Sequence, residues 1–196
     1  MEPTIPVDEA RFVLESQIRD CFGRVAYSHK THEKMAERYA SRLNITKWGM
    51  ILLSALITGG MTGVLFDKSS SFFPIVTAVL SILSLVFNSY MKDVDPGTNA
   101  QRHREAASKL WNMRVSYLSL LMDIKDKAVG MEALRKRRDQ LQSDLVRIYS
   151  SAPHTDDGAY GQAQEALQKN EDLTFSDEEL DRLLPPSIQR GRSDKP

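Results

Sequence analysis

The 196-residue sequence predicts an all-α protein with three parts: a two-helix transmembrane hairpin, cytoplasmic helices at both ends that form a helical bundle or coiled-coil rod, and a short acidic helical tail. Three observations predict this class. Two long uncharged segments follow one another closely, an apolar heptad pattern comes after them, and the last 46 residues are acidic and lack that pattern. The overall composition conceals this arrangement, because 26 basic and 26 acidic residues cancel.

The two uncharged segments are 19 residues long (48–66) and 23 residues long (69–91). At about 1.5 Å per helical residue, 19 to 20 residues cover roughly 30 Å, which is the thickness of the hydrocarbon core of a bilayer. Only residues 67–71 separate them, so they predict a hairpin with spans at 48–66 and 72–91. Basic residues precede the first span and follow the second, which predicts that both termini are cytoplasmic.

The cytoplasmic helices are predicted from apolar spacing. An N-terminal helix over 8–46 carries apolar residues at helical intervals, and a capping box of Thr98 and Gln101 predicts that a long helix begins at 98 and runs to 150. A three-four seam in that helix predicts packing against the N-terminal helix and, where the longer helix overhangs, against further copies of the chain. The rod and oligomer packing residues are Leu110, Tyr117, Leu120, Ile124, Met131, Leu134, Leu141 and Leu145.

After Ser150 the seam ends, and residues 151–196 predict an acidic tail that is partly helical or disordered. Residues 97–150 carry 11 basic and 6 acidic side chains, whereas 151–196 carry 5 and 10. Ser176 and Glu179 form a second capping box before a short leucine-rich helix, and residues 187–196 are expected to be disordered. The basic run 135–138 is either a solvated face or a docking place for this tail.

Within the spans, two patterns of small and polar residues stand out. Ala55, Gly59 and Gly63 form a small-xxx-small ridge that predicts close transmembrane packing. Thr77, Ser81, Ser84 and Asn88 form a polar stripe on the second span, which either packs within a helix bundle or lines a pore. We find no charged residue at mid-membrane, which disfavours a pump or proton relay.

The residues that could carry chemistry are few. His29, His32 and Glu33 lie on one helix, and His103 on another could approach them, so either a metal or pH-sensing cluster or ordinary packing of polar side chains is expected there. Cys21 lies on an apolar stripe and is interpreted as a small buried hydrophobe. No phosphate loop, nucleophile elbow or dinucleotide fingerprint is found. The sequence therefore predicts no enzyme, no cofactor, no resident metal and no direct binding of nucleic acid.

The sequence resembles the SLATT family, the SMODS and SLOG-associating two-transmembrane effector domain. The resemblance rests on the segment 26–34 (AYSHKTHEK), on residues 174–179 (TFSDEE) with the closing Leu184 and Pro185, and on a set of residues in the helix after the hairpin. These are Ala100, His103, Arg104, Ala107, Leu110, Trp111, Arg114, Tyr117, Leu120, Leu121 and Asp123. By this resemblance, residues 1–150 correspond to the two-transmembrane domain.

The resemblance implies a membrane effector of prokaryotic antiviral defence, of the abortive-infection type. Such an effector would sit in the cell inner membrane as a multi-pass protein, assemble as a homo-oligomer, and form a pore or disrupt the membrane when a separate sensor or a nucleotide-signal-producing protein triggers it. The alternative is a non-conducting membrane scaffold that anchors or restrains a signalling or toxic partner.

Overall fold

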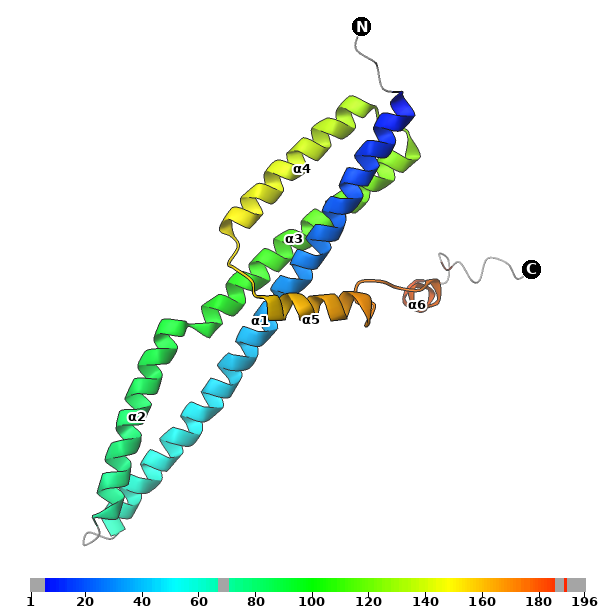
Figure 1. Cartoon of the computed structure of the whole chain (residues 1–196). Coiled ribbons are helices and arrows are strands. Elements are labelled where there is room, and N and C mark those ends of the chain that lie inside the picture. The colour runs from blue at the N-terminus through cyan, green and yellow to red at the C-terminus, as the bar shows by residue number, and fades with distance from the viewer. Residues whose placement is uncertain (1–5, 67–70, 186–188, 190–196) are drawn as a thin grey trace.

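The computed structural model describes residues 6–66, 71–185 and 189, and these form an all-α protein, which confirms the expected fold class. Figure 1 shows a long, narrow molecule in which two helices form one end and a bundle forms the other. The residues 67–70 of the expected loop, and residues 186–188 and 190–196 of the tail, lie outside the described residues.

Helix α1 runs from Val7 to Phe66, 60 residues without a break. It therefore joins the expected N-terminal helix and the first span into one helix of about 90 Å. Helix α2 (Phe72–Val94) lies beside its C-terminal part and helix α3 (Pro96–Asp126) beside its N-terminal part (Figure 1). The start of α1 lies at the bundle end of the molecule, and the end of α1 and the start of α2 lie at the opposite end (Figure 1).

The joint between α2 and α3 is a single residue, Asp95, in the left-handed region with φ 35°. Its carboxylate accepts a hydrogen bond from the backbone N–H of Thr98 at 3.1 Å, so Asp95 caps α3, and Pro96 occupies the first helical position, where no N–H is needed. The expected capping box of Thr98 and Gln101 was wrong, because Asp95 already satisfies the N–H groups at this end.

The long helix expected over 98–150 is also wrong. It is divided between α3 and α4 (Met131–Ser151), and α4 folds back along the bundle (Figure 1). Lys127 ends α3 in the left-handed region with φ 60°, and Gly130 begins α4 with an extended backbone. Arg11 stabilises this turn, since its guanidinium donates to the carbonyl oxygens of Ile124 at 3.2 Å and Val129 at 2.8 Å.

The core of the bundle lies between α1, α3 and α4. Helix α1 begins at Val7, near the point where α3 ends and the chain turns into α4. If α3 and α4 formed one straight helix, the α4 part would extend past the start of α1 and have no partner. Because α4 folds back, its apolar residues are buried within the same chain. The core residues are Leu14, Ile18, Val25, Leu110, Met113, Tyr117, Leu120, Ile124, Leu134 and Leu141. The expected overhang for pairing with other copies is therefore absent among the described residues.

The tail forms two helices, α5 (Asp157–Gln168) and α6 (Asp177–Leu183). Helix α5 lies across α1 and buries Ala159, Ala163 and Ala166. The capping box of Ser176 and Glu179 is confirmed at the start of α6, where the Ser176 Oγ accepts from the Glu179 N–H at 3.2 Å and the Glu179 carboxylate accepts from the Ser176 N–H at 2.9 Å.

Candidate functional site

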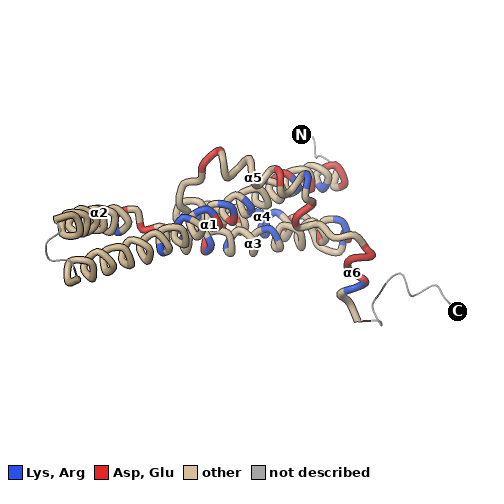
Figure 2. Tube along the Cα trace, turned by 90° about the horizontal axis from the view of Figure 1, so that it is seen from below, with Lys and Arg blue, Asp and Glu red and all other residues tan. Residues whose placement is uncertain are grey.

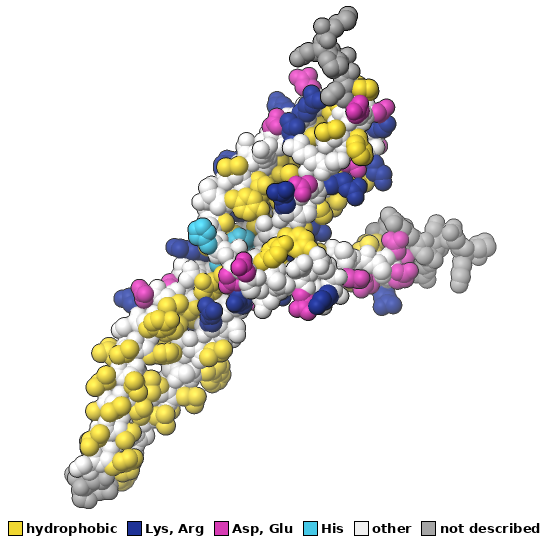
Figure 3. All heavy atoms as spheres, in the orientation of Figure 1, with side chains coloured by type: hydrophobic (Ala, Val, Ile, Leu, Met, Phe, Trp, Pro, Cys, Tyr) yellow, Lys and Arg dark blue, Asp and Glu magenta, His cyan; other side chains and the backbone are white. Residues whose placement is uncertain are grey.

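The hairpin of α2 and the second half of α1 exposes apolar side chains on its outer surface. Large residues such as Trp48, Leu56, Phe66, Ile75 and Leu85 are each at least 60% exposed. Figure 3 shows this apolar end of the molecule, and Figure 2 shows that charged residues concentrate toward the other end. Both helices are long and apolar enough to cross a membrane, and their apolar surface is not buried within the chain. A bilayer is the environment that would cover such a surface.

The four residues of the polar stripe do not share one environment. Thr77 is buried against α1, and Ser84 is partly buried. Ser81 and Asn88 are exposed at the edge of the interface between the two helices. Ser81 donates to the Thr77 carbonyl oxygen at 2.8 Å and Asn88 to the Ser84 carbonyl oxygen at 2.7 Å, so each satisfies one polar group within α2. The structure thus divides the stripe into an inner pair and an outer pair.

Close packing between α1 and α2 uses only part of the small-residue ridge. A Cβ added at Gly63 would meet the Phe73 ring at 2.6 Å, and one added at Gly60 would meet the Thr77 hydroxyl. One added at Gly59 would meet nothing within 4 Å, and Ala55 is exposed. The ridge Ala55, Gly59 and Gly63 is therefore not one packing surface in this hairpin. Sequence reasoning missed Gly60, although its spacing of three from Gly63 is also helical.

The residues assigned to rod and oligomer packing lie inside a single chain. Leu110, Tyr117, Leu120, Ile124, Leu134 and Leu141 are at most 3% exposed, and Met131 and Leu145 pack beside them, partly buried. The six most buried of these side chains therefore face the core of a single chain.

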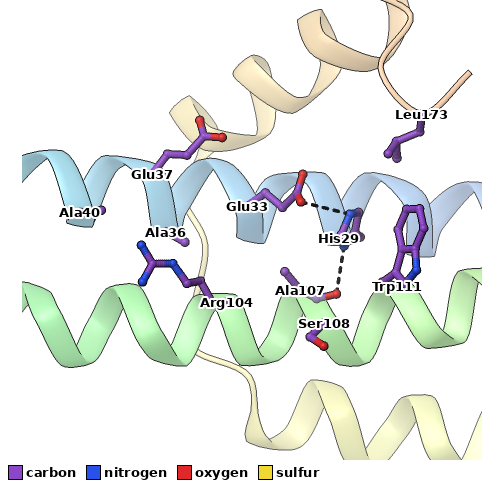
Figure 4. Close-up of a pocket in the computed structure, with 10 residues that line it drawn as sticks. All are labelled: His29, Glu33, Ala36, Glu37, Ala40, Arg104, Ala107, Ser108, Trp111 and Leu173. Atoms are coloured by element: carbon purple, nitrogen blue, oxygen red, sulfur yellow. Dashed lines mark hydrogen bonds and ion pairs between the residues drawn. The ribbon is translucent and has the colours of Figure 1, made fainter.

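A cluster of buried polar residues lies where α1 and α3 meet near the membrane end of the bundle. His29, His32 and His103 are each at most 5% exposed. The Nδ1 atoms of His32 and His103 are 2.9 Å apart and share one hydrogen bond, and the Nδ1 of His29 bonds the Ala107 carbonyl oxygen at 2.9 Å. The other ring nitrogen of His29 lies 3.5 Å from Glu33 (Figure 4).

Burial, together with the neighbouring His103 and His29, lowers the pKa of His32 from 6.5 to about 4. Burial also lowers the pKa of His103, against the opposing influence of Asp156. The hydrogen bond between the two Nδ1 atoms requires that one of them accept, so at least one of the two rings is neutral. Among the described residues no group of three or more His, Cys, Asp or Glu side chains could hold a metal ion. The burial of the three histidines and their hydrogen bonds across α1 and α3 are what ordinary packing of polar side chains would give.

Beside this cluster, a groove of about 800 Å³ opens between α1 and α3. Figure 4 shows its lining: the carboxylates of Glu33 and Glu37 on α1, the guanidinium of Arg104 and the ring of Trp111 on α3, and Leu173 from the tail. The groove is thus closed on one side by the segment between α5 and α6.

The tail is held on α1 by ionic and aromatic contacts, not on the basic run of α4. Lys30, only 9% exposed, binds Asp172 at 2.7 Å and Glu33 at 3.0 Å. Arg38 binds Asp156 at 2.6 Å, and the rings of Tyr27 and Tyr160 stack with centroids 5.8 Å apart. Burial alone would lower the pKa of Lys30, but hydrogen bonds to Asp172 and Glu33 outweigh it and raise that pKa.

Comparison with known families gives one finding that covers most of the chain. The model of the SMODS and SLOG-associating 2TM effector domain family 4 matches residues 14–179. No curated protein and no solved structure matches the chain. The matched range begins in α1 and ends in α6, so it includes the hairpin, the bundle and the docked part of the tail.

Proposed function

Because the chain belongs to the SMODS and SLOG-associating 2TM effector domain family 4, a family of membrane effectors of defence systems, we propose that it oligomerises and permeabilises the inner membrane of a prokaryotic cell during infection. The family description names an effector domain and no enzymatic activity. The observation that carries the proposal is the hairpin: two apolar helices with an exposed polar edge at Ser81 and Asn88.

One hairpin offers two helices and cannot enclose water, so a pore requires several copies. The polar edge supports this arrangement, because an exposed hydroxyl and amide in a span are more stable against water or another helix than against lipid. In a ring of hairpins, Ser81 and Asn88 would face the lumen, while Thr77 and Ser84 would hold α2 against α1. The proposal thus keeps all four residues but gives them two roles.

We place both termini in the cytoplasm. Arg38, Arg42 and Lys47 precede the first span in α1, and Lys92 follows the second, at the end of the hairpin that joins the bundle. The trigger then reaches the bundle from the cytoplasm, from a separate sensor or a nucleotide-signal-producing protein, which agrees with the association with SMODS and SLOG in the family description.

Replacement of the outer polar pair tests the pore. Ser81→Leu with Asn88→Leu should reduce ion release from liposomes that contain the full chain by about tenfold or more while assembly persists. Ser89→Leu is the matched control: Ser89 is also exposed, donates to the Leu85 carbonyl oxygen at 2.9 Å, and lies about 100° around the helix from Asn88. Equal loss in both variants, or none in either, would reject the lumen assignment.

The second candidate is the non-conducting scaffold. It is favoured by the close fit of α1 and α2 at Gly60 and Gly63, which makes the hairpin a compact anchor. Ion and dye release separate the two functions, because a scaffold leaves liposomes intact at every protein density. Release that rises steeply with density supports the pore.

A further inference from the structure

We propose that helix α6 of one copy docks on the outer face of α4 in the neighbouring copy, so that copies link head to tail. This inference rests on the proposed oligomer and names its contact. It begins from two surfaces that remain exposed after the bundle has buried its heptad seam. One is the basic outer face of α4, and the other is the acidic helix α6 with its leucines.

The outer face of α4 is basic and hollowed. A shallow groove runs along it, and its charged lining consists of Arg135, Lys136, Arg137 and Arg147 together with Glu132, Asp139 and Asp144. Asp139 pairs with Arg138 and Asp144 with Arg147, so Arg135, Lys136 and Arg137 leave an excess of positive charge over Glu132. Among the residues that the structure describes, Arg135 and Lys136 form no ion pair. Val146, which is 62% exposed, lines the adjacent groove between α1 and α4. The outer face of α4 therefore offers unpaired positive charge.

Helix α6 has the complementary chemistry. Its first turn carries Asp177, Glu178 and Glu179, and Leu180 and Leu183 are exposed to 38% and 75%. In a helix these two leucines share a face, and Asp177 and Glu179 flank it. A face of leucines bordered by carboxylates fits a groove bordered by Arg135 and Lys136.

Geometry prevents the contact within one chain. Asp172 forms an ion pair with the buried Lys30, and Leu173 lines the groove beside His29 and Trp111. Only residues 174–176 connect this anchor to α6, which limits the start of α6 to roughly 14 Å from Leu173 at about 3.5 Å per residue. Helix α4 lies on the other side of the α1–α3 pair (Figure 1), so the bundle itself separates the outer face of α4 from α6 of the same chain.

The positions of α4 and α6 favour the same contact between two neighbouring copies of the chain. Figure 1 shows α6 projecting from one side of the bundle at a level along the molecule that α4 also occupies on the opposite side. Two copies standing side by side in one membrane therefore present α6 and α4 to each other. Because the two surfaces differ, the contact is heterologous, and repetition around an axis normal to the membrane closes a ring. Confinement of all copies to one bilayer raises their effective concentration, so that a small contact is sufficient.

Disulfide cross-linking in proteoliposomes of the full chain tests the contact. In a Cys21→Ala background, one chain carrying Lys136→Cys and Leu183→Cys should form a ladder of dimers, trimers and larger products under mild oxidation. The single-cysteine chains should give no product beyond a dimer. A fast-migrating monomer, which indicates cross-linking within one chain, or the absence of a ladder overturns the proposal.

Charge reversal checks the specificity of the ladder. The cross-link is formed here between Gln140→Cys and Leu183→Cys. Arg135→Glu with Lys136→Glu should reduce its yield at least fivefold, and Asp177→Lys with Asp181→Lys should reduce it equally. A chain that carries all four charge reversals should recover the original yield. Lys125→Glu, which reverses an exposed charge at the far end of α3, is the control. A ladder unaffected by reversal, or by 1 M salt, which reduces the Debye length to about 3 Å, overturns a charge-directed contact.

Ion release measured on the same samples separates this inference from the proposed function. Undiminished release without a ladder rejects the α6–α4 contact and leaves the pore in place. A ladder without release in any sample rejects the pore and leaves the contact in place.

Discussion

At the scale of single residues, the His32–His103 pair makes the stability of the bundle dependent on pH. The folded chain holds the pKa of His32 at about 4, whereas an exposed histidine has 6.5. Between these values the unfolded chain binds a proton that the folded chain does not, so stability falls as the pH falls from 6.5 to 4, by up to about 1.4 kcal/mol per pH unit. Above pH 6.5 this contribution is complete.

His32→Gln should therefore flatten the decline of the thermal midpoint between pH 6.5 and pH 4, measured in nanodiscs by circular dichroism. His154→Gln is the control, since His154 is exposed in the segment between α4 and α5. The explanation fails if both variants keep the slope of the original chain.

Another residue-scale expectation concerns Lys127, which adopts φ 60° although it carries a side chain. Lys127→Gly should stabilise the bundle by about 0.5–1 kcal/mol, because glycine adopts this conformation without steric cost. The exposed ion pair with Asp8 is lost in this variant, but such pairs contribute little. Ala128→Gly, one residue further, is the comparison and should not stabilise. Chemical unfolding monitored by helicity provides the measurement.

At the scale of helices, the fit between α1 and α2 depends on which glycine is replaced. Gly60→Leu should force the helices apart at Thr77 and cost about 1–3 kcal/mol, typical of overpacking. Gly59→Leu should be tolerated, because no atom lies within 4 Å of its Cβ position. Cross-linking between cysteines placed in α1 and α2 reports the separation; equal disruption by both variants would contradict this interface.

The docked tail gives a second expectation at this scale. Asp172→Asn removes the charge that binds Lys30, and the bond to Lys30 is the first cause of the lowered pKa of Asp172. Limited proteolysis between 168 and 176 should become several-fold faster. Glu171→Gln, at an exposed neighbouring position, should leave the cleavage rate unchanged.

Helix-scale features also show how far the sequence could be used. Uncharged length predicted the spans, and a capping box predicted the start of α6, because both signals are local. The break after Asp126 was missed, because the apolar seam continues in phase across Lys127 and Gly130 and only the end of α1 at Val7 makes the turn favourable. The tail's anchor on Lys30 and Arg38 was missed as well, because charge sums indicated only that the basic run 135–138 was either a solvated face or a docking place for the tail. Which cations bind the tail depends on burial and on the packing of α5 against α1, and neither is visible in a charge sum.

At the scale of the whole molecule, the seam stabilises a single chain. Leu141→Ala should destabilise the bundle by about 2–5 kcal/mol, the range for truncation of a fully buried leucine, without altering the number of copies per assembly. Val146→Ala, at an exposed position of α4, should cost far less. Mass photometry combined with thermal unfolding separates the two effects. If Leu141→Ala changed the number of copies per assembly but not the stability, the seam would lie at the interface between copies and this expectation would be wrong.

The unbroken α1 has a mechanical consequence. His29 and Gly60 lie on the same helix, about 46 Å apart, without a proline or a left-handed residue between them. A tilt applied to α1 within the bundle would therefore be transmitted along the helix to its membrane-spanning part. Helix α2, by contrast, meets α3 at Asp95, where the left-handed backbone interrupts the helix. A movement of the bundle would therefore reach the first span through a continuous helix and the second span through this one-residue joint.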